Sequence, residues 1–337
     1  MRQLFLYLVI VVILAVAGDY LFYLKQLPRN LGLHGNIIIS ATQDPRDDML
    51  ETGFLNLDTE SVQAIRENET SHGAIYSFSS NKKHVTFLGL TLSSLQMGSI
   101  AKIQPGQAVQ VYSADATGAA ALPSPDSARL LTNSSDLIKQ TPEISDDGSA
   151  VLYVSTNSQN IPGTGDPGIS GYSLHLVKIS ATTTTDSVLT IGIQPRWITN
   201  TIFCYIATDG IRLWDTVHSQ SLLVLPVTGQ SDFKLSVSPN HKILAFSFPD
   251  ANKVLIYDLA SDGTFSGHPG SIPIMGFWVV FSPDSKFMAI QTAQPGSGHV
   301  LSHPSIEFYD AATLQKVDTE ISLDPFLNDR LFVTAWL

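Results

Sequence analysis

Residues 163–168 read GTGDPG and match the GxGxxG pattern found in many dinucleotide-binding loops. In such loops the third glycine opens a helix, and the N-terminus of that helix holds the pyrophosphate. Here Pro167 and Gly168 lead into YSLHLVKIS, a sequence typical of a β-strand. We therefore interpret the segment as a connecting loop and predict no bound nucleotide.

His299 and His303 have the i, i+4 spacing of a pair of metal ligands. That spacing brings two imidazoles together only on a helix. The surrounding segment, QPGSGHVLSHP, is rich in Gly and Pro and indicates a surface loop. The pair is accordingly no metal site, and we predict no cofactor.

Acidic residues recur at the ends of apolar segments and inside polar turns. Carboxylates are frequent in turns because they accept hydrogen bonds from the following backbone N–H groups. We expect all of these residues to cap turns: Asp58, Asp146, Asp147, Asp215, Asp258, Asp284 and Asp310.

Other signs of catalysis are weak. No GxSxG motif is present, and Cys204 lies in the apolar segment TIFCYIA, where we expect a buried thiol without a redox role. The sequence therefore predicts no catalytic residue.

A repeated unit of three strands organises most of the chain. It contains an apolar strand, a polar turn, a second apolar strand, a loop and a third strand that often ends in Asp. The clearest copy is LSVSPNHKILAFSFPDANKVLIYDLAS, at residues 235–261. The turns carry the Ser, Pro, Asn, Asp and Gly residues that tight turns favour, and the second strands are rich in β-branched and aromatic residues.

A bulky residue precedes each turn at intervals of 40 to 66 residues, about the length of one propeller blade. We expect Trp197 and Trp336 in particular to lie in the core between blades. The full set is Phe78, Ile144, Trp197, Val237, Phe281 and Trp336.

The two ends of the repeat region complete one another. GNIIISA (35–41) and GFLNLDT (53–59) resemble a second and a third strand without a first, and RLFVTAWL (330–337) resembles a first strand alone. Pairing these ends would close a ring and leave no open edge at the seam. We predict an all-β fold with six four-stranded blades. Seven is the alternative if residues 91–107 or 116–140 contain a degenerate blade.

The SPN and SPD turns, followed by LIYDL, LWDT or FYDA, resemble the repeats of TolB-like and WD-repeat-like bacterial β-propellers. The resemblance covers residues 35–337 and implies a six-bladed propeller. The turns SSN (79–81) and TN (199–200) depart from the motif because they lack proline.

Residues 1–25 form a candidate transmembrane segment. LFLYLVIVVILAVA (4–17) continues as YLFYL (20–24), and its aliphatic residues favour insertion by about 3 to 6 kcal/mol. We expect an uncleaved anchor, with signal cleavage near Ala17 as the alternative. Residues 26–34 would form a linker, and residues 35–337 the propeller outside the cytoplasm.

The chain has 19 basic and 30 acidic residues, a balance that argues against nucleic-acid binding and disfavours an anionic partner. We expect a non-catalytic platform that binds a protein, peptide or glycan of the cell envelope through its channel and its long inserts, at 114–130, 156–171 and 294–305. The alternative is a hydrolase or lactonase with acidic or His residues at the channel mouth.

Overall fold

The computed structural model describes residues 31–42, 51–59, 61–64, 77–89, 110–116, 128–134, 137–157, 168–227, 234–248, 252–294, 302–322 and 330–337. The candidate transmembrane segment, most of the GTGDPG loop and His299 lie outside these ranges. Within them, no helix is long and apolar enough to cross a membrane.

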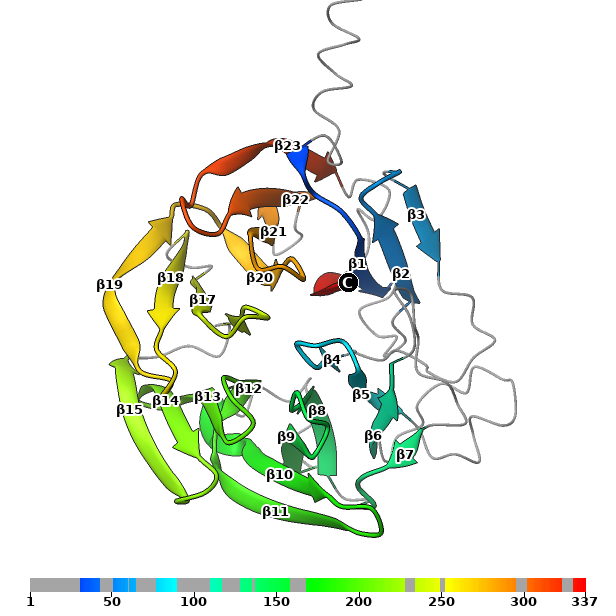
Figure 1. The fold of residues 1–337 in the computed structure, drawn as a ribbon, viewed down its shortest axis with the longest axis vertical. Coiled ribbons are helices and arrows are strands. Elements are labelled where there is room, and N and C mark those ends of the chain that lie inside the picture. The colour runs from blue at the N-terminus through cyan, green and yellow to red at the C-terminus, as the bar shows by residue number, and fades with distance from the viewer. Residues whose placement is uncertain are drawn as a thin grey trace, which may run out of the picture.

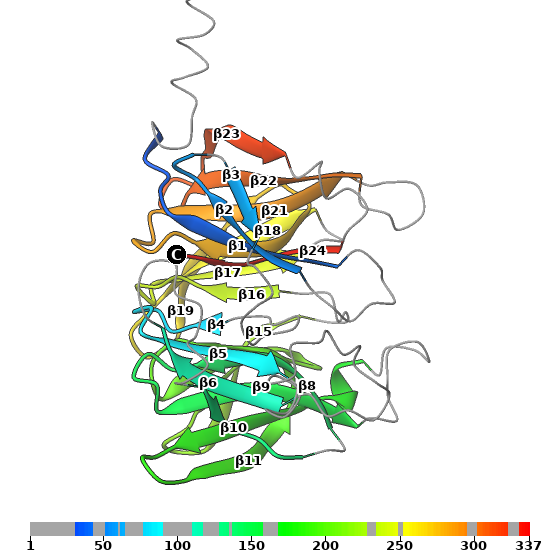
Figure 2. The ribbon, with the colours of Figure 1, turned by 90° about the vertical axis from the view of Figure 1, so that its right-hand side faces the viewer.

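The described strands form six antiparallel four-stranded sheets arranged around a central axis, which confirms the six-bladed propeller (Figure 1). Figure 2 shows that many strands run along the short axis of the molecule. From the axis outward, blades one to three are β24 (Arg330–Trp336), β1 (Asn36–Thr42), β2 (Glu51–Asn56) and β3 (Ser61–Ala64); β4 (Ser77–Phe78), β5 (His84–Gly89), β6 (Gln110–Asp115) and β7 (Arg129–Leu130); β8 (Leu137–Ile144), β9 (Ala150–Asn157), β10 (Ser173–Ile179) and β11 (Thr184–Ile191).

The other three blades follow the same order along the chain. They are β12 (Ile193–Trp197), β13 (Ile202–Ala207), β14 (Gly210–Asp215) and β15 (Gln220–Pro226); β16 (Lys234–Val237), β17 (Ile243–Phe248), β18 (Lys253–Leu259) and β19 (Phe265–Ile272); β20 (Gly276–Phe281), β21 (Phe287–Gln294), β22 (Ser302–Asp310) and β23 (Lys316–Ser322).

The C-terminal strand closes the ring as predicted. β24 pairs with β1, and Leu337 and Asn36 exchange backbone hydrogen bonds of 2.7 and 2.9 Å. Trp336 is 1% exposed and donates its indole N–H to the His34 carbonyl at 2.8 Å. Gly35 has φ +93°, and a Cβ there would lie 2.2 Å from the Leu337 carbonyl oxygen, so the seam requires glycine.

The second and third strands supply much of the apolar core between blades. At the seam, Ile37 and Leu55 of blade one and Phe308 of blade six belong to one buried cluster. Leu33, just before the predicted start of the propeller, is fully buried in that cluster too. Blade-to-blade packing therefore holds the six inner strands around a common channel.

Candidate functional site

The inner strands of the six blades enclose a cavity of about 140 Å³ on the channel axis. β4, β8, β12, β16, β20 and β24 all contribute lining residues. Three of the four tryptophans of the chain, Trp197, Trp278 and Trp336, line it together with charged side chains. The cavity therefore combines aromatic and ionic surfaces.

The turn between the first and second strands has the same geometry in four blades. A serine donates its hydroxyl to an Asn or Asp two residues later and accepts the backbone N–H five residues later. In blade five, Ser238 bonds Asn240 at 2.7 Å, and the Ile243 N–H bonds Ser238 at 2.9 Å. The corresponding serines are Ser79, Ser145 and Ser282.

The fourth position of this turn is left-handed, with φ between +58° and +69°. A glycine occupies it in blade three and non-glycine residues in the other three: Lys82, Gly148, His241 and Ser285. Lys82 and His241 both line the cavity. The backbone of the turn is therefore the same in these blades, whereas the side chain at its fourth position varies.

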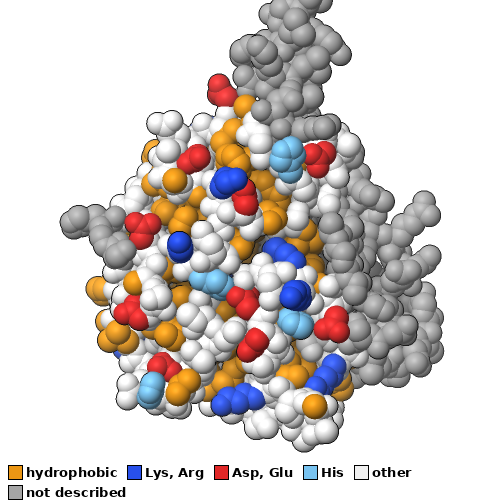
Figure 3. All heavy atoms as spheres, viewed as in Figure 1, with side chains coloured by type: hydrophobic (Ala, Val, Ile, Leu, Met, Phe, Trp, Pro, Cys, Tyr) orange, Lys and Arg blue, Asp and Glu red, His pale blue; other side chains and the backbone are white. Residues whose placement is uncertain are grey.

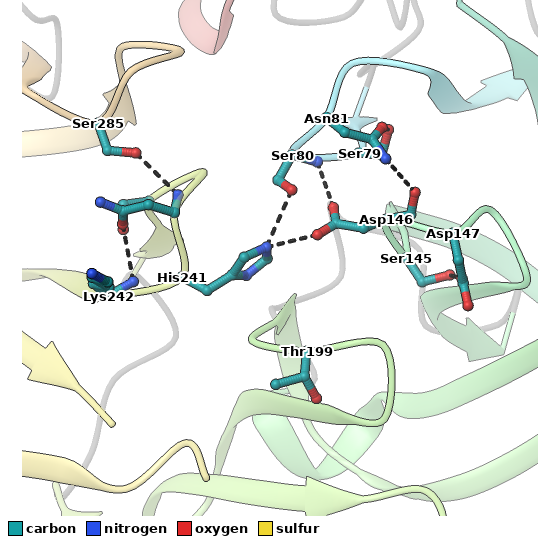
Figure 4. A network of polar contacts seen from close by, with 12 residues as sticks. Ser79, Ser80, Asn81, Ser145, Asp146, Asp147, Thr199, His241, Lys242 and Ser285 are labelled. Atoms are coloured by element: carbon teal, nitrogen blue, oxygen red, sulfur yellow. Dashed lines mark hydrogen bonds and ion pairs between the residues drawn. The ribbon is translucent and has the colours of Figure 1, made fainter. Parts of the chain in front are cut away.

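Hydrogen bonds join three of these turns across the end of the channel (Figure 4). His241 Nε2 of blade five lies 2.7 Å from Asp146 Oδ2 of blade three and 3.1 Å from Ser80 Oγ of blade two. The Ser80 backbone N–H donates to Asp146 Oδ1 at 2.7 Å. We call Ser80, Asp146 and His241 the mouth cluster. It connects blade five to two blades that are not its neighbours in the ring.

A second polar set lies deeper, on the inner strands. Arg196 of blade four forms an ion pair with Glu143 of blade three, and the two side chains are 18% and 14% exposed. Ser77 of blade two donates to Glu143 at 2.7 Å, while Arg196 donates to the Leu235 carbonyl of blade five at 2.8 Å. This set, called here the inner belt, connects four successive blades.

Two ionisable side chains at this end of the channel, Asp146 and Lys82, have pKa values shifted from their usual range. Burial alone would raise the pKa of the Asp146 carboxyl, but the hydrogen bonds with His241 and Ser80 outweigh it and hold the pKa below its usual value. Burial lowers the pKa of Lys82 to about 8, against the attraction of Asp146. Figure 3 shows acidic, basic and histidine side chains interspersed on this face.

The mouth cluster does not have the connectivity of a nucleophilic triad. In such a triad the base contacts the nucleophile through one ring nitrogen and the orienting acid through the other. Here Ser80 and Asp146 share Nε2, and His241 Nδ1 is buried without a partner in the described part of the chain. The geometry holds blades together and does not activate Ser80.

A Ser–His–Asp set with triad connectivity lies inside blade three. Ser155 Oγ is 2.8 Å from His175 Nε2, and His175 Nδ1 is 3.1 Å from Asp186. Tyr153 bonds the same Nδ1 and Asp186, at 2.9 and 2.5 Å. Ser155 and His175 are 2% and 5% exposed, so a substrate has no access to the hydroxyl and we interpret the set as internal bracing.

The acidic residues predicted to cap turns divide into two groups. Asp215 and Asp310 each accept two backbone N–H bonds from the following turn, and Asp147 and Asp284 hold the Ser-x-Asx turns, so the prediction is confirmed for these four. Asp58 instead contacts His34, at 2.9 Å. Asp258 is exposed at the penultimate position of β18.

For Asp146 the prediction was wrong. The Asx position of its turn is two residues after Ser145 and is occupied by Asp147, which leaves Asp146 to bond across the channel.

The remaining predicted residues have mixed outcomes. Trp197 and Trp336 are buried in the core as expected, and both also line the cavity. Cys204 is fully buried, and burial raises the pKa of its thiol to about 12 despite the nearby Arg196. His303 was expected in a loop but lies in β22, which begins at Ser302.

Sequence reasoning did not identify Lys82, Glu143, Arg196 or His241. Three or more His, Cys, Asp or Glu side chains placed to hold a metal are not found among the described residues. The signal that could have pointed to two of the missed residues was the repeat itself, because Lys82 and His241 share its fourth turn position.

No family model and no curated protein matches the sequence. Solved structures match in fold. TolB from Acinetobacter baumannii aligns with a TM-score of 0.54 and 14% identity, over 89% of this chain and 66% of TolB. A chain of the nidogen/laminin complex aligns with a TM-score of 0.52 and 12% identity, over 88% of this chain and 97% of that chain.

A puromycin-hydrolyzing peptidase of Mycobacterium tuberculosis aligns with a TM-score of 0.51 and 10% identity, over 86% of this chain and 45% of the peptidase. The present chain thus spans less than half of that enzyme and about two thirds of TolB. Identities this low show the fold alone. By its fold, the described part of the chain is a TolB-like six-bladed β-propeller.

Proposed function

We propose that the protein is a membrane-anchored, extracytoplasmic β-propeller that binds an envelope protein, peptide or small ligand through its channel without chemical turnover. The observation that carries the proposal is the aromatic and ionic cavity enclosed by all six inner strands. Concave sites that combine apolar walls with a few placed polar groups are the usual form of a ligand site.

The comparisons are compatible with this proposal. The nidogen/laminin structure is, by its name, a complex of two proteins. Four ionisable groups of the cavity form bonds that brace the blades: Glu143 with Arg196, and Asp146 with His241. Such groups hold the walls of a site in place, whereas the alternative of a hydrolase would need one of them oriented toward a substrate.

Photo-crosslinking in cells tests the proposal. A photoreactive residue replaces Pro239, which lines the cavity, in the full-length chain, and a matched variant carries it at Thr185, exposed on the outer strand β11. We expect a discrete crosslinked species from position 239 and none from position 185. Equal crosslinking from both positions, or none from 239, would remove the channel as the binding site.

The membrane anchor has its own test. Residues 1–25 lie outside the described ranges, and their hydrophobic run supports the proposal. We expect the full chain to stay with membranes after carbonate extraction and a chain lacking residues 1–25 to be released. Release of the full chain by carbonate would contradict the anchor.

A further inference from the structure

The charge of the cavity is opposite to that of the chain. The chain has a net charge of −11. The cavity is lined by three basic residues, Lys82, Arg196 and Lys234, and by two acidic residues, Glu143 and Asp146, with His241 as its one histidine. An excess of positive charge in a recess of an acidic protein concentrates anions there.

Among the described residues, Lys82 is a basic group of the cavity whose ammonium no protein acceptor engages. Arg196 is paired with Glu143, and Asp146 with His241. Within the described part of the chain, Lys82 Nζ has no hydrogen-bond or ion-pair partner, and it lies 5.9 Å from the centroid of the Phe78 ring. The Lys82 side chain is half-buried and its ammonium is not enclosed, so an anion that enters the cavity can reach it.

Two further features of the lining favour an anion with an apolar body. The Thr141 hydroxyl is buried and has no hydrogen-bond partner among the described residues, so it can donate to a ligand. Lys234 Nζ lies 5.1 Å from the Trp278 ring centroid, which places a second positive charge beside an aromatic wall. A cavity of about 150 Å³ holds a benzene-sized group in other proteins.

We propose that the channel cavity binds an organic carboxylate, with the Lys82 ammonium as the partner of the carboxylate and the tryptophan-lined wall as the contact of a small apolar body. This inference rests on the proposed function of the channel as a binding site, and it names the class of ligand. A free organic acid and the C-terminal carboxylate of a peptide both have this chemistry.

The test uses benzoate and its neutral analogue benzamide, titrated into the full-length chain in detergent by calorimetry. We expect benzoate to bind at least tenfold more tightly than benzamide. Lys82→Met should abolish that preference. Lys83→Met removes the same charge from the exposed neighbouring position and should leave the preference intact.

The pH dependence gives a second readout that needs no variant. Lys82, with a pKa of about 8, loses its charge between pH 7 and pH 9, so benzoate affinity should fall about tenfold over that interval. The other ionisable groups of the cavity are Glu143, Asp146, Arg196, Lys234 and His241. A pH-independent affinity would overturn the role of Lys82, even if Lys82→Met failed to fold.

A third comparison separates the two sources of carboxylate. If N-acetyl-phenylalanine competes with benzoate and its amide does not, the site accepts a chain end. If benzoate alone binds, the site takes a free organic acid. Equal affinity for benzoate and benzamide, or equal losses in Lys82→Met and Lys83→Met, would refute the carboxylate site. Crosslinking from position 239 would then still support a binding platform, so the two proposals can fail separately.

Discussion

Glu143→Gln should destabilise the propeller far more than loss of a surface ion pair. The amide keeps the shape of the side chain and can still accept the hydroxyl of Ser77, but it leaves the Arg196 guanidinium without a counter-charge. Breaking a buried pair costs about 3 to 5 kcal/mol, and the residual exposure of both side chains favours the lower end, about 3 kcal/mol.

The assay is thermal unfolding of the full chain followed by tryptophan fluorescence, since three of its four tryptophans line the cavity. At about 2 °C per kcal/mol for a domain of this size, the midpoint should fall by about 6 °C. The control is Lys286→Met, which breaks an ion pair with Asp284 whose side chains are 73% and 50% exposed, and it should cost less than about 1 kcal/mol.

A double variant completes the test. Combining Glu143→Gln with Arg196→Met removes both charges, so the combined cost should be smaller than the sum of the single costs by about 1 to 3 kcal/mol. Additive costs, or a Glu143→Gln midpoint within 1 °C of the Lys286→Met midpoint, would refute the inner belt as a stabilising ion pair.

Three further predictions concern the turns, the mouth and the core. Ser238→Ala should cost about 1 to 2 kcal/mol because it removes two turn hydrogen bonds, whereas Ser271→Ala, on an exposed position of β19, should be neutral in the same melting assay. The pKa of the Asp146 carboxyl is lowered in the folded state, so this group stabilises the fold above its usual pKa of about 3.9, and the stabilisation is lost as the pH falls below that value. Between pH 5 and pH 2.5 the melting midpoint should therefore fall less for Asp146→Asn than for the unmodified chain. Equal falls would contradict the mouth cluster. Cys204, the single cysteine, should react with a thiol reagent only in denaturant, and rapid labelling of the native chain at pH 8 would show that this blade is not closed.

The fold was predictable because a similar local sequence pattern recurs from blade to blade. Turns rich in Ser, Pro, Asn, Asp and Gly, a bulky residue before each turn and second strands rich in β-branched and aromatic residues specify the blade without reference to distant residues. In blade two the departure from the SPN motif did not move the blade boundary, because Ser79 and Asn81 form the same hydrogen bonds as the proline-containing turns. The incomplete sets of strands at the two ends correctly predicted the seam.

The site was less predictable because it depends on which turns meet across the axis. His241 lies 161 residues from Ser80 and 95 from Asp146, and no local pattern brings such positions together. The role of Asp146 could have been recognised, because the Asx residue always stands two positions after the serine and Asp147 therefore takes that role. The burial of Lys82 could not have been predicted, because its position in the turn also accepts Gly, His and Ser.

The net charge of the chain did not predict the charge of the cavity. Thirty acidic residues against nineteen basic ones suggested that an anionic partner is disfavoured. The cavity has the opposite balance because the propeller directs Lys82, Arg196 and Lys234 toward one axis. A composition describes the whole surface, whereas a ligand meets only the part that the fold encloses.

A crystal structure of the protein soaked with 4-bromobenzoate would test the channel most directly. The anomalous signal of bromine locates the ligand independently of any assumption about its site. We expect one peak inside the six inner strands, with the carboxylate within hydrogen-bond distance of Lys82 Nζ. Bromine peaks confined to the outer faces of the blades, with the cavity free of ligand at saturating concentration, would contradict this expectation.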